Sequence, residues 1–181
     1  KSETVLFSVQ DLIDEVVPSV LPAIKRKGLQ LLINNHLKAH DMRRGDRDAL
    51  RRILLLLMQY AVTSTQLGKI TLEVDQDESS EDRLTFRILD TGEGVSIHEM
   101  DNLHFPFINQ TQNADPLAFW LSDQLARKLG GHLNIKTRDG LGTRYSVHIK
   151  MLAADPEVEE EEERLLDDVC VMVDVTSAEI R

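Results

Sequence analysis

The sequence contains a single cysteine, Cys170, among its 181 residues. One thiol excludes an intramolecular disulfide framework and favours a reducing, cytosolic setting. Long apolar runs are also missing, because the longest candidate, residues 53–58, is far shorter than the roughly 20 residues that a membrane-spanning helix needs. No secretory signal is found. The chain begins with Lys1 in place of a methionine, so we expect it to be a fragment cut from a longer protein.

Residue patterns that bind metals or perform nucleophilic catalysis are missing as well. Of the six histidines, only His36 and His40 have the i,i+4 spacing of a metal-binding pair. They lie in a strand-to-loop stretch without carboxylate support. No Ser/His/Asp or Cys/His arrangement stands out. We therefore predict no metal site and no catalytic residue of these kinds.

The formal net charge of −10 is concentrated in one stretch of the chain. Residues 155–168 hold nine of the 31 acids and one of the 21 bases, a net charge of −8. Two acids and one base follow this stretch, which leaves 20 acids and 19 bases in residues 1–154. Because consecutive like charges repel one another, residues 155–168 are predicted to form a solvated linker. The alternative is an acidic tail that docks onto a partner.

Basic residues cluster near residue 46, where a helix is expected to begin. Asp46 and Asp48 lie among them, in a body that is almost neutral. This pattern predicts a solvated face with internal ion pairs, or else a docking patch for an acidic protein. Nucleic-acid binding is not expected without an excess of positive charge. The basic residues are Arg43, Arg44, Arg47, Arg51 and Arg52.

Hydrophobic periodicity predicts three helices. Asp11 is expected to N-cap the first, Pro18 and Pro22 to kink or break it, and Gly28 to end it. Asp46 is expected to open the second, in which apolar residues recur at three- and four-residue steps. Residues 117–129 form the third, which the pair Gly130-Gly131 ends.

Alternating apolar residues predict strands, and polar stretches predict the connections between them. The expected connections are a polar loop at 38–45, a hairpin loop at 75–82 and a turn at Asp139-Gly140. The order of elements predicts an α+β fold: a two-layer α/β sandwich with a mixed sheet of about five strands and helices on one face. The expected strands are 5–9, 29–37, 70–74, 84–88, 133–135 and 145–149.

Three parts are expected along the chain. Residues 1–154 form the folded domain, and residues 155–168 form the acidic linker. The run Val169–Asp174 has the pattern of a buried strand, so residues 169–181 are predicted to hold the first strand of a truncated second domain.

Several separated motifs resemble one family, the ATP-binding domain of histidine kinases and related ATPases. Asp90-Thr91-Gly92-Glu93-Gly94 matches the family's DxGxG loop, and Gly140-Leu141-Gly142-Thr143 resembles its final GxGT box. Phe105-Pro106-Phe107 resembles the phenylalanine box, and Gly45-Asp46 resembles the entry to the asparagine-bearing helix. The order and spacing of these motifs make a strong joint signal. The resemblance implies a Bergerat-type fold in which ATP lies between the helix layer and the central loops.

The resemblance also implies a nucleotide pocket, retained here in part. In the family, the DxGxG aspartate accepts a hydrogen bond from the adenine amino group, and the glycines let the backbone approach the ligand. The alternative for the Asp90 loop is a simple turn at the end of a strand. The vestigial pocket would comprise Asp90, Gly92, Gly94, Gly140, Gly142 and Thr143.

The positions that would hold magnesium and the phosphates depart from the family pattern. Leu56 and Tyr60 stand where the family has asparagines, and Thr63 stands where it has lysine. Pro116 and Ala118 stand in the second glycine box, where backbone N–H groups hold phosphates. Tyrosine cannot supply a compact oxygen ligand, and proline has no N–H. We therefore predict that ATP and magnesium binding are lost; Phe119 and Trp120 would fill the vacated space or belong to the core.

The phosphoacceptor box of a sensor kinase is absent, so the expected function is not catalytic. The resemblance implies a kinase-like signalling and scaffolding module of a phosphotransfer protein in a bacterial two-component phosphorelay. The parent would be an inner-membrane protein with this part in the cytoplasm, followed by a receiver-like domain and a downstream phosphotransfer histidine. The partners implied are a hybrid sensor kinase, a response regulator, a membrane regulator and a second copy of the chain. The alternatives are an active kinase domain or a magnesium-independent nucleotide sensor.

Overall fold

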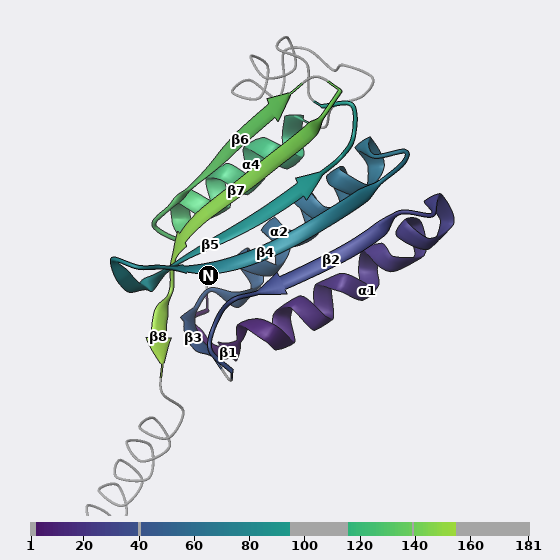
Figure 1. The fold of residues 1–181 in the computed structure, drawn as a ribbon. Helices are drawn as coiled ribbons and strands as arrows, with labels where there is room; N and C mark the ends of the chain where they lie inside the picture. The colour runs from purple at the N-terminus through teal and green to yellow at the C-terminus, as the bar shows by residue number, and fades with distance from the viewer. Residues whose placement is uncertain (1–2, 40, 95–115, 139, 155–181) are drawn as a thin grey trace, which may run out of the picture.

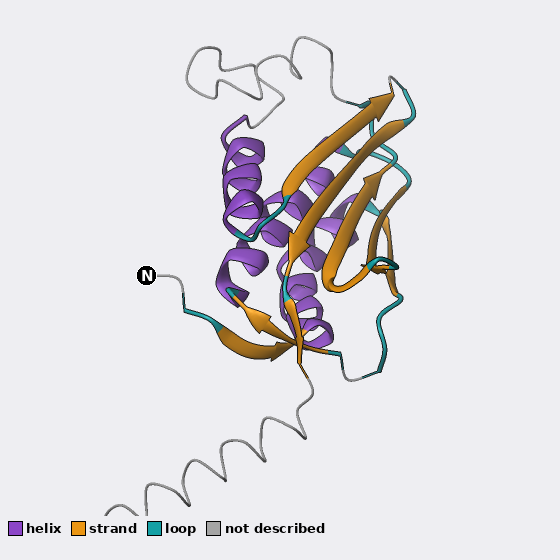
Figure 2. Ribbon diagram, turned by 90° about the vertical axis from the view of Figure 1, so that its left-hand side faces the viewer, coloured by secondary structure: helices purple, strands orange, loops and turns teal. Residues whose placement is uncertain are grey.

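The computed structural model describes residues 3–39, 41–94, 116–138 and 140–154. Helices α1 (Val9–Lys27), α2 (Arg47–Ser64) and α4 (Pro116–Lys128) pack on one face of a five-stranded sheet. The side view in Figure 2 separates the helix layer from the sheet layer. The predicted α+β sandwich, with a mixed sheet of five strands covered by helices on one side, is confirmed.

The large sheet has the strand order β2-β4-β5-β7-β6. Strand β2 is parallel to β4, and every other neighbouring pair is antiparallel. The central strand β5 pairs with β7 from Arg83, opposite Lys150, to Asp90, opposite Thr143. This register brings the end of the DxGxG strand beside the GxGT box. The strands are β2 (Gln30–Asn35), β4 (Lys69–Asp77), β5 (Ser80–Asp90), β6 (His132–Arg138) and β7 (Gly142–Lys150).

Helix α1 corrects two predictions. Its N-cap is Ser8, whose side-chain oxygen accepts a hydrogen bond from the Asp11 backbone N–H at 3.2 Å, so Asp11 is not the cap. Pro18 and Pro22 lie inside an unbroken helix of 19 residues, and both are exposed. Water can therefore solvate the carbonyls that the prolines leave without a donor, while the opposite face is buried. Gly28 ends the helix at φ 67°, as predicted.

Helix α2 provides the centre of the core. Asp46 caps it, as predicted, by accepting a hydrogen bond from the Ala49 backbone N–H at 3.0 Å. At its other end, the Lys27 ammonium donates to the carbonyl oxygens of Val62, Thr63 and Thr65 at 2.8, 2.9 and 3.1 Å. A positive charge at a helix C-terminus is favourable because it complements the helix dipole. Helix α1 therefore fixes the end of α2 that leads into β4.

The predicted polar loop at 38–45 is wrong in part, because residues Met42–Gly45 form strand β3. This strand pairs with β1 (Val5–Ser8) and β8 (Leu152–Ala154) in a second, three-stranded sheet. The hairpin loop predicted at 75–82 is also too long, because β4 and β5 leave only two residues between them. Both stretches are polar; β3 pairs with strands distant in sequence, whereas β4 and β5 continue their local hairpin pairing through the polar residues.

Arg43 links the small sheet to the large one. Its guanidinium is fully buried and donates to both carboxylate oxygens of Asp41, at 2.7 and 2.8 Å. It also donates to the Gln76 side-chain oxygen at 3.0 Å and to the Glu81 carbonyl at the β4–β5 hairpin. A buried cation needs such a full set of partners to offset its desolvation.

The rest of the basic cluster is internally paired to a large extent, as one of the two interpretations predicted. Arg47 and Arg51 both form ion pairs with Glu15 of α1. These two pairs lower the pKa of the Glu15 carboxyl. Arg52 is exposed.

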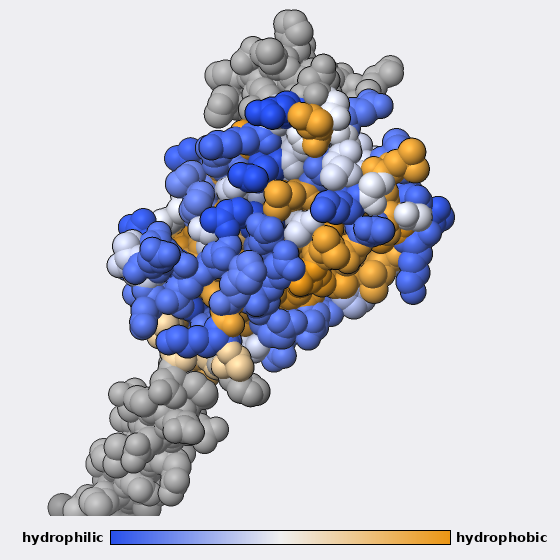
Figure 3. Space-filling model, viewed as in Figure 1, coloured by the Kyte–Doolittle hydropathy of each residue, from blue (hydrophilic) through white to orange (hydrophobic). Residues whose placement is uncertain are grey.

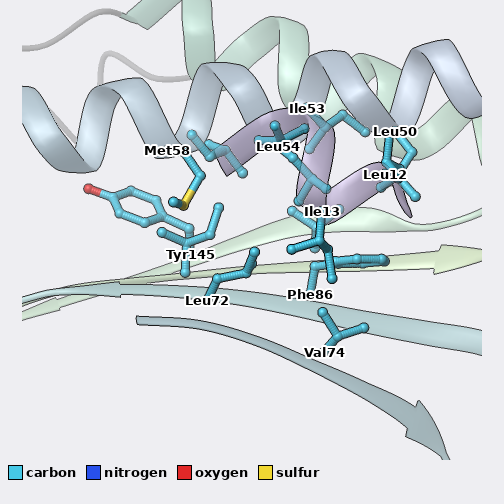
Figure 4. Close-up of a cluster of buried hydrophobic side chains, with 14 of the residues drawn as sticks. Leu12, Ile13, Leu50, Ile53, Leu54, Met58, Leu72, Val74, Phe86 and Tyr145 are labelled. Carbon is cyan, nitrogen blue, oxygen red and sulfur yellow. The ribbon is translucent and has the colours of Figure 1, made fainter. Parts of the chain in front are cut away.

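The packed core lies between α2, α1 and the sheet. Figure 4 shows Leu50, Leu54 and Met58 of α2 pointing toward Phe86 and Leu72 of the sheet. All five are fully buried. The described helices leave the opposite face of the sheet uncovered, and Figure 3 looks onto it. No helix among the described residues is long and apolar enough to cross a membrane.

Replacing Arg43 by methionine should lower the free energy of unfolding by about 3–5 kcal/mol, because the partly buried Asp41 carboxylate loses its counter-charge and the buried acceptors around Arg43 lose their donor. Urea denaturation followed by circular dichroism measures this change. The control is Arg52→Met, at an exposed site, which should change stability by less than about 0.5 kcal/mol. Equal effects of the two substitutions would contradict the role given to Arg43.

Candidate functional site

The candidate site lies where β5 and β6 end and β7 begins. Asp90 is the last residue of β5, and one of its carboxylate oxygens, Oδ1, accepts backbone hydrogen bonds from Gly92 at 2.9 Å and Thr143 at 3.3 Å. Its second oxygen, Oδ2, is buried and has no hydrogen-bond partner among the described residues. The Tyr145 hydroxyl is near enough to the Asp90 carboxyl to help lower its pKa.

Burial sets the charge state of this corner. Only 5% of Asp90 is exposed. Burial raises the pKa of its carboxyl, while the Gly92 amide, the nearby Tyr145 hydroxyl and the Thr143 amide oppose that rise. The Tyr145 hydroxyl is itself buried without a hydrogen-bond partner among the described residues, and burial followed by the charge of Asp90 raises its pKa. At neutral pH the corner thus holds a protonated phenol beside a buried carboxyl.

Gly142 allows the close approach of the two strand ends. Its φ is 103°, and a Cβ placed on it would lie 2.0 Å from the Asp90 carbonyl oxygen. A Cβ on Gly92 would meet the Ser64 carbonyl oxygen at 2.7 Å. Glycine at both positions therefore lets the Asp90 loop pack against the end of α2 and against β7.

The remaining predicted residues lie in the same corner. The backbone N–H of Gly140 donates to the Glu93 carbonyl at 2.9 Å, which joins the β6–β7 turn to the DxGxG loop. A Cβ on Gly94 would lie 2.9 Å from the hydroxyl oxygen of Thr137. The Thr143 hydroxyl lies 3.2 Å from that same hydroxyl. The structure thus brings Asp90, Gly92, Gly94, Gly140, Gly142 and Thr143 together.

A hollow of about 700 Å³ opens at these strand ends. Asp90, Gly142 and Thr143 line it, together with Thr137 and basic residues of β6 and β7. No residue of α2 or α4 lines this hollow. Leu89, Lys136, Arg138 and Arg144 also line it, so the hollow extends onto the face of the sheet that points away from the helices.

The positions that replace the family's asparagines and lysine lie on α2. Tyr60 is buried, with 9% of its surface exposed, and Leu56 is half-buried. Thr63 is exposed, and its hydroxyl donates to the Gln59 carbonyl at 2.9 Å. Gln59, which has the nearest amide side chain on this helix, is exposed as well. No carboxamide of α2 therefore reaches the interior where the two asparagines would act.

Tyr60 belongs to a cluster of three aromatic rings. Its ring centroid lies 4.4 Å from that of Phe119 and 6.0 Å from that of Tyr145, edge-on in both cases. Phe119 and Tyr145 are stacked at 5.6 Å. The cluster joins α2, α4 and β7, and Phe119 and Tyr145 are 1% and 0% exposed. Trp120 is only half-buried.

Helix α4 begins at Pro116, in the segment that stands where the family has its second glycine box. Ala118 is 5% exposed, so its methyl group faces the interior at the first turn of the helix. The pyrrolidine nitrogen of Pro116 carries no hydrogen, which removes one donor from this turn.

Two polar residues of the corner were not predicted from sequence. Thr137 on β6 lies opposite Thr143, and Tyr145 on β7 lies opposite Ile88. The alternation of β7 could have indicated Tyr145, since it follows Thr143 by two residues and therefore points to the same face. Thr137 gave no signal of its own, because its place depends on the pairing of β6 with β7.

Some of the predicted features lie outside the described residues. The phenylalanine box at residues 105–107 and the predicted domain beyond residue 154 lie outside the described residues, as does His40. His36 is within hydrogen-bond distance of Asp75, at 2.7 Å. The described residues contain no group of three or more metal-binding side chains of His, Cys, Asp or Glu.

Comparison with known proteins agrees with this geometry. The chain belongs to the family of histidine kinase-, DNA gyrase B- and HSP90-like ATPases, whose model matches residues 45–153. The family resemblance predicted from the motifs is thereby confirmed.

Two of the similar curated proteins are a bacterial phosphotransferase and a bacterial sensor kinase. Phosphotransferase RcsD of Escherichia coli strain K12 is 97% identical over 186 aligned positions, which cover 100% of this chain and 21% of that protein. Sensor histidine kinase RcsC of Salmonella typhimurium is 24% identical over 170 positions, covering 91% of this chain and 18% of that protein. The chain thus spans about a fifth of the length of these curated relatives.

Solved structures show the same fold. Full-length ShkA in complex with AMPPNP superposes with a TM-score of 0.75 at 20% identity, covering 85% of this chain and 32% of that one. The nucleotide-free catalytic domain of histidine kinase ThkA gives a TM-score of 0.69 at 17% identity, covering 82% and 95%.

Gly142→Ala should destabilise the protein by at least about 3 kcal/mol, because it adds backbone strain and a clash with the Asp90 carbonyl. The matched control is Gly140→Ala. Gly140 also has a positive φ, of 68°, but a Cβ there meets nothing within 4 Å. That variant should lose only about 1–2 kcal/mol, the cost of the left-handed conformation. Similar denaturation midpoints for the two variants would contradict the close approach at Gly142.

Proposed function

We propose that this chain is a non-catalytic, kinase-like signalling and scaffolding module of a phosphotransfer protein in a bacterial two-component phosphorelay. The observation that carries the proposal is the aromatic cluster of Tyr60, Phe119 and Tyr145. It lies between α2, α4 and β7, on the side of Asp90 where the resembled site would hold magnesium and phosphates.

Steric exclusion is the first argument. Aromatic pairs with centroids 4.5–7 Å apart are favourable packing, each worth about 0.5–1.5 kcal/mol beyond buried area. Admitting a triphosphate would require separating these rings and exposing their faces to charge. The ring of Tyr60 is buried and in contact with Phe119, so we infer that it closes this side of the pocket.

Missing ligands are the second argument. Magnesium requires oxygen ligands at about 2.0–2.1 Å in near-octahedral geometry. Leu56 and Tyr60 provide no carboxamide oxygen. Thr63 is exposed and has no ammonium group. The residues present therefore do not fit magnesium-bound ATP. We infer that ATP and magnesium binding are lost and that no residue of this chain is catalytic.

The wider context rests on the relatives and belongs to the same proposal. The phosphotransferase RcsD and the sensor kinase RcsC suggest that the whole protein relays phosphoryl groups from a hybrid sensor kinase to a response regulator. We propose RcsC, the response regulator RcsB and the membrane regulator IgaA as partners, and inner-membrane attachment of the parent protein. A phosphotransfer histidine would then lie outside this chain, and residues 169–181 would begin a receiver-like domain.

Calorimetric titration of the chain with Mg-ATP should give no heat of binding at sub-millimolar concentrations, and no phosphate should be released. The corresponding domain of a sensor kinase relative serves as the positive control. The variant Tyr60→Asn should also fail to bind, because Leu56, Thr63 and Pro116 remain. Magnesium-dependent binding or turnover by the unaltered chain would contradict the proposal.

One observation favours a second candidate, a magnesium-independent sensor of adenine nucleotides or nucleosides. Asp90 Oδ2 is a buried acceptor without a hydrogen-bond partner among the described residues, and Asp90 is one of the residues that line the hollow. A buried polar atom left unpaired costs about 1–3 kcal/mol, and a ligand N–H donor would remove that cost.

Titration with adenosine and with ADP, both in excess EDTA, tests this candidate. It expects saturable binding that Asp90→Asn weakens at least about tenfold, because an amide nitrogen replaces the acceptor. The asparagine oxygen can still accept from Gly92 and Thr143, so the fold should persist in circular dichroism. Absence of binding to either ligand rejects the sensor and leaves the scaffold.

A further inference from the structure

The uncovered face of the large sheet is basic over three of its five strands. Along β5, β7 and β6, alternate residues point away from the helices, as the burial of their neighbours shows. From residue 83 to 89 of β5, and along all of β6 and β7, none of these outward positions is acidic. The outward bases, which we call the basic face, are Arg83, Arg87, Lys136, Arg138, Arg144 and Lys150.

These charges lie close to one another. Lys136 is directly opposite Arg144, and Arg83 is directly opposite Lys150. Neighbouring strands are about 4.8 Å apart and residues two apart on a strand about 7 Å apart, less than the Debye length of about 8 Å at physiological salt. The charges therefore repel one another.

Few acids of the described residues offset this repulsion. Arg87 alone among the six forms an ion pair, with Asp75 of β4, and His36 contacts the same carboxylate. Asp77 at the hairpin lies near enough to Arg83 for that charge to help lower the pKa of the Asp77 carboxyl. Four bases on β6 and β7 remain without an acidic partner among the described residues. In Figure 3 this half of the face is mainly hydrophilic, while apolar side chains gather toward β2.

The same chain contains a segment of matching charge. Residues 155–168 carry a net charge of −8, although residues 1–154 are almost neutral. This segment follows β8. Strand β7 ends at Lys150, and only Met151 separates β7 from β8. Its attachment point is therefore close in sequence to the Arg83–Lys150 end of the basic face.

The length of the segment is sufficient. Fourteen residues span up to about 46 Å when extended, at about 3.3 Å per residue. The path from the end of β8 back along its three residues and the nine residues of β7 is about 40 Å long, so the extended segment can reach the far end of β7. Tethering also raises the local concentration of the acidic segment to the millimolar range, which no free acidic protein reaches readily.

We propose that the acidic segment, residues 155–168, binds across the basic face of β5, β7 and β6. Opposite charges separated by a short tether attract one another without a hydrophobic contact, so the complex is electrostatic and weakens as salt rises. The segment would occupy the one sheet face that the helices leave open and would fix where the following residues leave the domain. This inference is independent of the proposed loss of ATP binding.

Paramagnetic relaxation in the full 181-residue chain tests the proposal. Cys170→Ser removes the native thiol, and Glu161→Cys carries a nitroxide label in the middle of the acidic segment. At low salt, the backbone amide signals of Asn134 and Ser146 should lose about half or more of their intensity relative to the reduced label. The loss should largely disappear at 1 M salt, where the Debye length is about 3 Å.

Two charge variants are matched controls. Lys136→Gln with Arg144→Gln should restore the amide intensities, whereas Arg52→Gln, on α2, should not. Changing the five glutamates at 159, 160, 162, 163 and 157 to glutamine should act like the double variant. Unchanged intensities at β6 and β7 in the labelled parent, broadening that persists at high salt, or broadening centred on α2 would each overturn the proposal. An external acidic partner would then be the better occupant of the face.

Discussion

The packing of Tyr60 against Phe119 and Tyr145 is the constraint on which this account depends. These three rings hold α2, α4 and β7 together on the inner side of the sheet. The proposed loss of ATP binding depends on this packing, because the family resemblance implies that the phosphates of ATP would lie on this side of the sheet. Close-packed rings and a triphosphate cannot share one volume, because cores of this density leave no room for added atoms. The same contacts that stabilise the fold therefore argue against the chemistry that the fold usually performs.

At the Asp90 end of the site, the loop is held in place by hydrogen bonds and by close backbone packing. Asp90 is held by the amides of Gly92 and Thr143, and Gly142 lets the two strands approach. Burial nevertheless raises the pKa of the Asp90 carboxyl, and its second oxygen has no partner among the described residues. A module that needed only stability would gain from an apolar side chain there. This geometry supports the proposal that the corner is a vestigial nucleobase pocket.

Much of the fold followed from local patterns, and the exceptions have physical causes. Asp46 as a helix cap and the alternation that ends at Asp90 were predicted because both depend on residues near in sequence. Strand β3 was missed because Arg43, a charged residue, is buried by partners up to 108 residues away. Helix α1 was expected to break at its prolines, but both are exposed there. Tyr145 joins the site through strand pairing, which the sequence of β7 alone does not determine.

The central claim is that Tyr60 stays packed where phosphates would otherwise bind. Nuclear Overhauser contacts between the Tyr60 ring and the rings of Phe119 and Tyr145 measure this directly in solution, before and after addition of excess Mg-AMPPNP. The account predicts strong contacts at both stages, with unchanged chemical shifts for all three rings. Loss of the Tyr60–Phe119 contact on addition of the nucleotide, with new contacts from Tyr60 to solvent-exposed residues, would contradict it.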